Sequence, residues 1–384
     1  MSDDMFEYQK WNRYFAQIAG GIESIGEQEL KELGAHDIRQ SFRGLYFKAD
    51  QETVYSINYQ SRLITRVLAP LLTFDCHSTR YLYKTAKKKI KWETIFQKNH
   101  TFAIFASVSN SKIRHSKYAA LCLKDAIADY FRDLFEKRPN VEKKDPDVWI
   151  NLFIQNNKAV ISIDMSGGSL HRRGYRKVSG DAPMQETLAA TIIRLSNWDG
   201  SLPVYDPMCG SGTLLCEMLM HYCKIPAGYL KKKFGFEFLP DFNRNIWRYV
   251  KDSSNKKIRE LNEGLIYGSD VSPESVSMAK TNLSNLPYSN SVALKVSDFR
   301  DLKNLKKAAV ICNPPFGIRL GTKDEVAGMY REFGVFLKQL CSGSIAHIYL
   351  GSLNQIKNIG LNASLKIPLV NGAIKGRLCR FEIF

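Results

Sequence analysis

Apolar residues near the N-terminus recur with alternating strand-like and helix-like periods. Residues 14–47 show a strand pattern, then an amphipathic helix, then a second strand, with glycines where the elements meet. The apolar face of the helix is formed by Ile22, Ile25, Leu30 and Leu33. This pattern predicts a small α+β unit, to which we assign residues 1–65.

The following segment has longer elements, and we assign residues 66–168 to a second α+β unit. Its helical patterns cover residues 53–68 and 117–135, and its strand patterns cover 101–108, 148–155 and 158–166. The last two strands are close in sequence and are predicted to pair as a hairpin. Residues 137–146 are charged and contain two prolines, so the preceding helix should end there.

Residues 171–183 are polar, basic and glycine-bearing, and they separate this half from a region of repeated strand–helix alternation. Strands are predicted at 203–207, 264–270, 292–299, 308–316 and 345–350, and helices at 184–198, 213–223, 272–283 and 326–340. Short apolar strands that alternate with helices favour a parallel, doubly wound α/β sheet. We assign residues 169–384 to this domain.

Composition and charge narrow the class of protein. The 384 residues are 44% hydrophobic, which excludes disorder over the whole chain, and Lys plus Arg exceed Asp plus Glu by 55 − 38 = 17. Such an excess of cations favours a polyanionic partner, and nucleic acid is our first choice over a membrane surface. The chain has no apolar run of about 18 residues and starts with an acidic segment, so we expect a cytoplasmic protein. Its eight cysteines form no C-x-x-C pairs, so we expect reduced thiols and no metal.

The first candidate for chemistry is the segment DPMCGSGT, which lies between a predicted strand and helix and contains Asp206, Gly210, Gly212 and Thr213. Glycines at such a turn allow the backbone to approach a cofactor, and the helix N-terminus supplies oriented N–H groups. The segment matches neither G-x-x-x-x-G-K nor G-x-G-x-x-G, which disfavours nucleoside triphosphates and dinucleotides. A glycine turn without any ligand remains the alternative for this segment alone.

Two more acidic residues end the next predicted strands. Asp270 should lie beside the glycine loop, where its carboxylate can accept hydrogen bonds from ribose hydroxyls. Asp298 could accept a hydrogen bond from an adenine amino group, with Phe299 against the ring. Either acid alone could equally be a helix cap or a solvated turn residue.

The third candidate is Asn313-Pro314-Pro315-Phe316-Gly317, at the end of an apolar strand. The two prolines interrupt strand pairing, which leaves carbonyl groups free to face a ligand. If the Asn313 side-chain oxygen and the Pro314 carbonyl accept the two protons of an exocyclic nucleobase amine, its lone pair can be directed at a methyl carbon. Phe316 would stack on the base. A Pro-Pro turn that only ends a strand is the alternative.

DPMCGSGT, GSD and NPPFG together resemble the class I S-adenosylmethionine-dependent amino-methyltransferases. With FAQIAGGIESIGEQELKELGA, HRRGYR and AP-x-x-ETLAA, the chain resembles the THUMP-containing bacterial 23S rRNA guanine-N2-methyltransferases over nearly its whole length. The resemblance implies a ferredoxin-like unit, an RNA-binding THUMP domain and a Rossmann-like catalytic domain that produces N2-methylguanine. Many relatives carry Tyr where Phe316 stands, and some are fused to a second methyltransferase domain, so we expect only the first of the two methylations here.

The resemblance also implies roles for individual residues. Asp206, Gly210 and Gly212 would line the methionine side of S-adenosylmethionine, together with Thr213 at the start of the helix. Asp270 would hold the ribose and Asp298 the adenine. Pro183 and Glu186 match a motif that closes over the methionine end. The implied partner is structured RNA, either 23S rRNA or a precursor large-subunit particle, and a monomer is compatible with the pattern.

Basic segments agree with an RNA partner. The cations Lys84, Lys87, Lys88, Lys89 and Lys91 lie beside Tyr81, Tyr83 and Trp92, which combines phosphate-neutralising with stacking groups. A solvated basic face is the alternative. In the junction, Arg172, Arg173 and Arg176 could contact either RNA or the cofactor-side loops.

Two other functions compete with this interpretation. An N6-adenine methyltransferase acting on DNA or RNA would use the same Asn-Pro-Pro-Phe geometry, and the predicted RNA-binding module argues against the DNA enzyme. A non-catalytic RNA-binding or ribosome-assembly factor could bind S-adenosylmethionine without turnover, but the retained Asn313 and acidic residues argue against it. Cytosine C5 methylation is disfavoured, because Pro-Pro-Phe stands where a cysteine nucleophile would be required.

Overall fold

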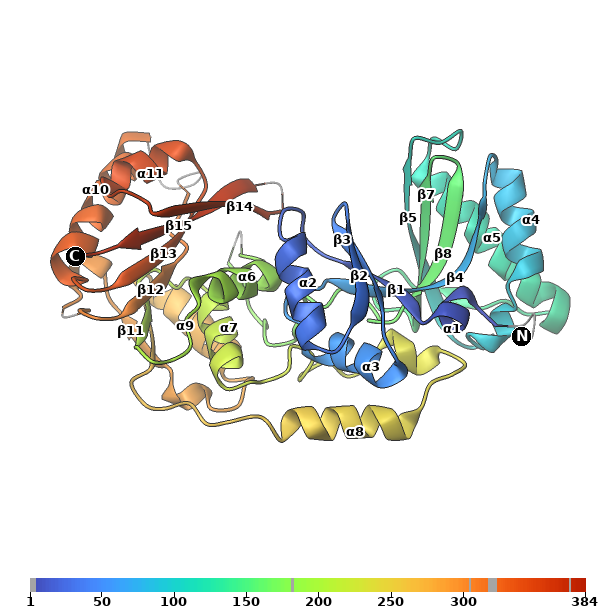
Figure 1. The fold of residues 1–384 in the computed structure, drawn as a ribbon, viewed down its shortest axis with the longest axis horizontal. Helices are drawn as coiled ribbons and strands as arrows, with labels where there is room; N and C mark the ends of the chain where they lie inside the picture. The colour runs from blue at the N-terminus through green and yellow to red at the C-terminus, as the bar shows by residue number, and fades with distance from the viewer. Residues whose placement is uncertain (1–4, 181–182, 304, 317–322, 373) are drawn as a thin grey trace. The chain divides into compact units, whose positions relative to one another are not determined.

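The computed structural model describes residues 5–180, 183–303, 305–316, 323–372 and 374–384 (Figure 1). The chain divides into two compact units. Unit 1 consists of Met1–Ala19, Glu23–Leu170 and Lys231–Asp252, and unit 2 consists of Gly20–Ile22, His171–Leu230 and Ser253–Phe384. No helix in the described part of the chain is long and apolar enough to cross a membrane.

Unit 1 is built on an eight-stranded sheet of order β2-β3-β1-β4-β8-β7-β5-β6. The strands are β1 (Arg13–Gln17), β2 (His36–Ser41), β3 (Gly44–Lys48), β4 (Arg66–Asp75), β5 (Thr101–Ser109), β6 (Asn140–Val141), β7 (Val148–Gln155) and β8 (Lys158–Asp164). The helices are α1 (Glu7–Trp11), α2 (Glu23–Glu32), α3 (Gln51–Gln60), α4 (Thr79–Lys89) and α5 (Ser116–Phe135). The predicted hairpin is confirmed as β7 and β8, which pair antiparallel across Asn156 and Asn157. Both asparagines have positive φ, as a tight hairpin turn requires.

The N-terminal strands bury one of their two faces. Tyr14 and Ala16 of β1 lie opposite Phe47 and Leu45 of β3, and all four are buried. Helix α2 packs closely on this face, because a Cβ added to Gly26 would lie 3.1 Å from the Leu45 side chain. The predicted α+β unit is therefore present, with β2 as an additional edge strand that the sequence pattern did not indicate.

The helix predicted over residues 53–68 is wrong in its second half. Helix α3 is capped by Asp50, whose side chain accepts a hydrogen bond from the Thr53 N–H, and the helix ends at Gln60. Residues 66–68 instead begin β4, which pairs with β1 and β8. The apolar residues here are buried between neighbouring strands, and such a short apolar run does not distinguish a strand from a buried helix by its period.

A segment distant in sequence completes unit 1. Residues 231–252 pack beside α3, where the Phe236 ring lies 4.3 Å from the Tyr55 ring and Trp247 contacts both aromatic rings. The predicted range 169–384 grouped this segment with the C-terminal domain. Helix α8 (Arg244–Asn255) continues from this segment into unit 2.

Unit 2 contains a seven-stranded sheet of order β11-β10-β9-β12-β13-β15-β14. Its strands are β9 (Val204–Asp206), β10 (Ile266–Asp270), β11 (Ala293–Val296), β12 (Ala309–Cys312), β13 (Ile345–Leu350), β14 (Leu365–Asn371) and β15 (Ile374–Glu382). Its helices include α6 (Glu186–Ser196), α7 (Thr213–Tyr222), α9 (Pro273–Leu283), α10 (Lys323–Leu340) and α11 (Leu353–Ile359). The first five strands in this order are parallel to one another, and β15 pairs antiparallel with both β13 and β14. This confirms the predicted doubly wound α/β fold.

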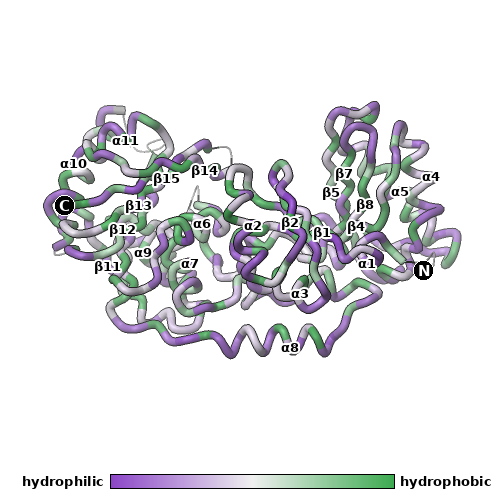
Figure 2. The backbone as a smooth tube through the Cα atoms, viewed as in Figure 1, coloured by the Kyte–Doolittle hydropathy of each residue, from purple (hydrophilic) through white to green (hydrophobic). Residues whose placement is uncertain are grey.

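The hydropathy of the elements agrees with their positions in this architecture. The buried β13, with the sequence IAHIYL, is coloured hydrophobic in Figure 2, whereas α4, with TRYLYKTAKKK, is mostly hydrophilic. A compact cluster of buried side chains from β12, β13, β15, α10 and α11 stabilises the C-terminal half of unit 2. The carboxyl ends of the parallel strands lie at one edge of the sheet, where ligands bind in this class of fold.

Candidate active site

A pocket of about 210 Å³ lies at the carboxyl edge of the unit 2 sheet. Its walls include Pro183, Asp206, Gly210, Thr213, Met278 and Asn313. Asp206 ends β9 and Asn313 directly follows β12, and these two strands pair in parallel. Residues that are far apart in sequence therefore share one pocket.

The glycine loop after β9 is held by the next strand. The Gly210 N–H donates a hydrogen bond to Asp270 Oδ2 at 2.9 Å, and Asp270 Oδ1 accepts another from the Ser272 N–H at 3.0 Å. Both loop glycines have positive φ, but their surroundings differ. A Cβ on Gly212 would lie 2.9 Å from the Ala279 Cβ of α9, whereas a Cβ on Gly210 would meet no atom within 4 Å. Gly212 thus permits the close approach of α9, and Gly210 leaves open space in the pocket wall.

Asp206 is buried in the floor of this loop. The pKa of its carboxyl is raised to about 7, mainly by burial and to a smaller extent by the nearby Asp270, although hydrogen bonds from the Met208 N–H and the Cys312 thiol lower it. The Met208 bond is 3.3 Å long. A buried carboxyl with few donors can become a carboxylate most readily when a cation enters the pocket.

Asp298 and Phe299 lie outside the lining of this pocket. Asp298 accepts a hydrogen bond from the Arg300 N–H and forms an ion pair with the Arg300 side chain at 2.7 Å. The Phe299 ring is buried against Phe333 and Phe336, so its packing gives no support to the expected contact with an adenine ring. The residue fills the core between its short 3-10 helix and α10.

The Asn313 side chain supplies the most informative polar atom of the pocket. Its Oδ1 is buried and has no hydrogen-bond partner among the described residues. The carbonyls of Pro315 and Phe316 accept hydrogen bonds from Tyr330 Oη at 3.1 Å and Gln355 Nε2 at 3.0 Å. No described residue donates to the Pro314 carbonyl. Asn313 and Pro314 therefore present the acceptors of this turn that remain available to a ligand.

Phe316 follows Asn313 by three residues, and its ring packs on residues at the end of β13. Its ring meets the buried Tyr349 edge-on, with 5.7 Å between ring centroids, and covers Gly351, where an added Cβ would lie 3.0 Å from the ring. Gly317, the last residue of the predicted motif, lies outside the described residues.

Arg176 connects the walls of the pocket. Its Nε donates to Glu186 at 2.8 Å, and its Nη2 donates to the Met184 carbonyl and Thr213 Oγ1, both at 2.9 Å. Glu186 is buried at the start of α6, and Thr213 is the first residue of α7. The arginine thus joins the N-termini of two helices beside this pocket.

The two neighbouring arginines, Arg173 and Arg172, differ in burial. The Arg173 side chain is fully buried and forms an ion pair with the equally buried Glu217, which also accepts a hydrogen bond from Tyr175 Oη. An RNA contact by Arg173 is therefore wrong, because reaching solvent would leave Glu217 without this cation in the core. Arg172 is exposed.

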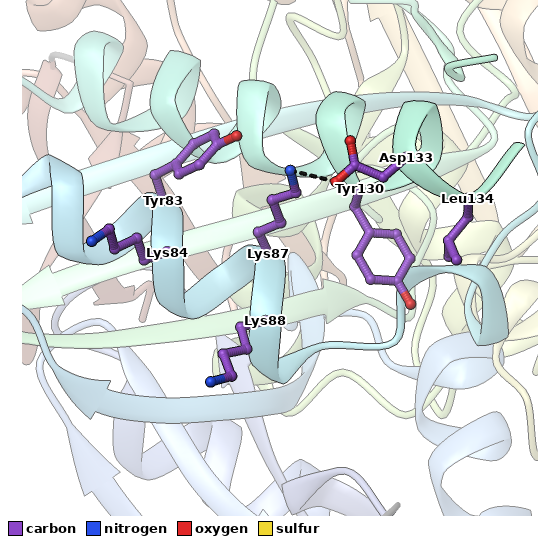
Figure 3. A pocket seen from close by; sticks show the side chains of 7 residues that line it. All are labelled: Tyr83, Lys84, Lys87, Lys88, Tyr130, Asp133 and Leu134. Carbon is purple, nitrogen blue, oxygen red and sulfur yellow. Dashed lines mark ion pairs between the residues drawn. The ribbon is translucent and has the colours of Figure 1, made fainter. Parts of the chain in front are cut away.

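The predicted basic segment lies on α4 and the residues that follow it. A pocket of about 480 Å³ between α4 and α5 is lined by Tyr83, Lys84, Lys87, Lys88, Tyr130, Asp133 and Leu134. Figure 3 shows Lys87 reaching the Asp133 carboxylate, 2.7 Å away, while Lys84 and Lys88 extend away from this pair.

The residues of this basic segment differ in their exposure to solvent. Lys84, Lys88, Lys89 and Lys91 are exposed, and we call these four residues the α4 basic surface. Trp92 is fully buried, and its Nε1 donates to the Ala86 carbonyl, so the expected stacking role of Trp92 is wrong. Tyr81 stays exposed.

A doubly wound sheet with a glycine loop, a carboxylate on the next strand and an Asn-Pro-Pro turn around one pocket defines a class I methyltransferase domain. The described residues contain no group of three or more His, Cys, Asp or Glu side chains suited to a metal ion. The open space at Gly210 and the unpartnered Asn313 Oδ1 are features that an organic ligand with hydrogen-bond donors would fit.

Comparisons with known proteins agree with this class. Residues 173–380 match the family model described as RMKL-like, methyltransferase domain, residues 78–164 match the THUMP domain, and residues 13–68 match the RlmL ferredoxin-like domain. A Synechocystis protein provisionally named RNA methyltransferase slr0064 is 36% identical over 97% of both chains. The crystal structure of SMU.472, a provisionally assigned methyltransferase complexed with SAH, has 27% identity and a TM-score of 0.85 and covers 97% of this chain and 98% of its own.

This chain belongs to the RMKL-like methyltransferase family and carries a THUMP domain and an RlmL-type ferredoxin-like domain before the catalytic domain. It is also 34% identical, over 94% of its length, to the ribosomal RNA large subunit methyltransferase K/L of Photobacterium profundum. The chain spans about half the length of that relative, 52%. The family resemblance in the sequence is therefore confirmed.

The raised pKa of Asp206 makes stability depend on pH. In the unfolded chain an Asp ionises near pH 4, whereas folded Asp206 keeps its proton up to about pH 7. Its stabilising contribution is therefore complete below about pH 4 and is lost as the pH rises to about 7. We expect the Asp206→Asn variant to lose less unfolding free energy than the wild type between pH 5 and pH 8. Urea denaturation at these pH values measures this, and parallel losses in both proteins would contradict the assignment.

Proposed function

We propose that this protein transfers a methyl group from S-adenosylmethionine to the exocyclic N2 amine of a guanine in 23S ribosomal RNA. The buried, unpartnered Asn313 Oδ1 in the wall of the pocket that contains the glycine loop carries the proposal. The names of the K/L relatives, which are ribosomal RNA large subunit methyltransferases, support the choice of substrate.

The site can raise the reactivity of an amine that is a weak nucleophile. The lone pair of a guanine N2 is delocalised into the ring. Asn313 Oδ1 and the Pro314 carbonyl would accept its two protons, which favours a tetrahedral nitrogen and directs the lone pair into the pocket. Phe316, seated on Tyr349, would stack on the base once it leaves its helix. The product nitrogen can lose its extra proton to water, so no general base is required.

The remaining pocket residues fit the cofactor. When bound, S-adenosylmethionine supplies an electrophilic methyl group. Asp206 would attract the ammonium of its methionine end, and Gly210 leaves room beside the loop. Each oxygen of Asp270 accepts one backbone N–H and has capacity for one further donor, such as a ribose hydroxyl. Pro183 lines the same pocket, while Glu186 would act through Arg176.

Among the proposed cofactor contacts, the adenine contact of Asp298 has the least support, because its carboxylate already pairs with Arg300. An adenine contact would need one of its oxygens to accept an additional donor. We retain Asp298 as a proposed adenine acceptor and omit Phe299.

The identity of the methylated nucleoside tests the proposal directly. The purified protein is incubated with isotopically labelled S-adenosylmethionine and undermodified ribosomal RNA, either naked or as precursor particles, and the digested products are identified by mass spectrometry. We expect labelled N2-methylguanosine. Labelled N6-methyladenosine would support amine methylation but show that the substrate base is adenine. Cofactor binding without any methylated product would favour a non-catalytic RNA-binding factor.

Removal of the proposed acceptor should affect chemistry more than binding. We expect Asn313→Ala to lower the methyl-transfer rate by about two to three orders of magnitude, the effect of losing one oriented polar group in an active site. Affinity for S-adenosylhomocysteine should change little, as measured by calorimetry, because Asn313 faces the base. Asp270→Ala serves as the matched contrast and should weaken that affinity. Unchanged turnover in Asn313→Ala would refute the assignment.

The α4 basic surface should contribute to RNA affinity through phosphate contacts. Each lost contact lowers the slope of log affinity against log salt by about one. We expect this change for Lys88→Ala, because Lys88 is exposed and has no ion pair among the described residues. The adjacent Lys87 is already paired with Asp133, so Lys87→Ala should change the slope less. Equal slopes for wild type and Lys88→Ala would assign this residue to a solvated face.

A further inference from the structure

In the ferredoxin-like part of unit 1, strands β1 and β3 have a second face, opposite the one on which α2 packs. In β1 and β3 the residues that alternate with the buried set are paired across the strands, so Phe15 lies opposite Tyr46 and Arg13 lies opposite Lys48. In β2, Arg39 lies opposite Tyr46 and His36 lies opposite Lys48. Residues directly opposite one another in an antiparallel pair project from the same face.

Two aromatic rings form the centre of this face. The Phe15 and Tyr46 rings are 4.8 Å apart, and Tyr46 is 42% exposed. Phe15 lies directly over Gly44, where an added Cβ would come within 2.0 Å of the ring. The absence of a side chain at Gly44 therefore lets the ring lie against the backbone beside Tyr46. Adjacent aromatic rings on neighbouring strands are the arrangement by which sheet surfaces stack successive unpaired bases.

Cations surround the aromatic pair. Arg13 and Arg39 are exposed and have no ion pair among the described residues, and Lys48 pairs with the exposed Asp37 at 2.6 Å. The turn between β2 and β3 adds Arg43 and Phe42, whose side chain is 88% exposed. A large apolar residue at the tip of a two-residue hairpin turn contributes nothing to the core. Its exposure next to arginines is favourable where bases and phosphates bind.

We propose that this face, which we call the aromatic sheet face (Arg13, Phe15, Arg39 and Tyr46), binds single-stranded RNA by stacking unpaired bases on Phe15 and Tyr46. Arg13 and Arg39 neutralise the adjacent phosphates. The proposal rests on the proposed function in that RNA is the substrate, and it adds a second contact region, separate from the α4 basic surface. The positive charge of the face favours a polyanion over a second copy of this chain, whose net charge is +17.

The test measures binding of a short fluorescein-labelled single-stranded RNA by anisotropy with the full-length protein. Tyr46→Ala should weaken affinity about tenfold, which corresponds to about 1.4 kcal/mol, within the range for stacking on one aromatic ring. Tyr46→Phe should bind as the wild type does, because stacking needs the ring and not the hydroxyl. Tyr249→Ala, which removes another exposed tyrosine of unit 1, is the matched control and should have no effect.

Three results would overturn the proposal. Wild-type affinity in Tyr46→Ala, an equal loss in Tyr46→Phe, or self-association by light scattering that Tyr46→Ala abolishes would each assign this face another role. Thermal unfolding checks that the variants fold. Should Tyr46→Ala fail to fold, photocrosslinking of the wild type to RNA containing 4-thiouridine decides. Crosslinked peptides that contain Phe15 or Tyr46 support the proposal, and crosslinks confined to α4 contradict it.

An assay of methyl transfer to ribosomal RNA, run beside the binding assay, distinguishes failure of this proposal from failure of the proposed function. If wild-type protein methylates RNA but fails to bind the single-stranded probe, the aromatic sheet face is refuted and the enzyme activity stands. If the protein binds the probe through Tyr46 but yields no methylated RNA, the face stands and the activity is refuted. With both intact, Tyr46→Ala should raise the KM for RNA and leave kcat and cofactor affinity unchanged.

Discussion

Parallel pairing of β9 with β10 and β12 is the constraint on which the candidate active site depends. It aligns Tyr205 with Tyr267 and Val310, so the carboxyl ends of all three strands reach one edge of the sheet. The hydrogen bond from the Gly210 N–H to Asp270 then fixes the first loop against the second. Without this alignment, Asp206 and Asn313 would not share a pocket.

Buried charges hold the polar segment that precedes this sheet. Arg173 pairs with Glu217, and Arg176 pairs with Glu186 while it also bonds Thr213. Burial of such groups is costly unless each cation finds its carboxylate. The segment is therefore fixed to α6 and α7 by two of its arginines, whose charges are paired with carboxylates within unit 2.

The sequence was informative where one local pattern has one structural solution. Strands buried on both faces, such as β12 and β13, give continuous apolar runs that are readily recognised. No residue of strand β2 is fully buried, and the strand gives no such run. Local patterns also did not reveal that residues 231–252 join unit 1, because the contact between Phe236 and Tyr55 links distant parts of the chain.

The sequence by itself determined the α/β class, the order of strands and helices around the site, and the motifs at the strand ends, because periodicity, glycines and prolines act locally. The tertiary structure decided which side chains are available. It buried Trp92, Arg173 and Phe299, left Asn313 Oδ1 without a partner among the described residues, and placed Phe15 beside Tyr46 on an open face. Burial and pairing depend on neighbours contributed by distant segments, and a local pattern contains no information about those neighbours.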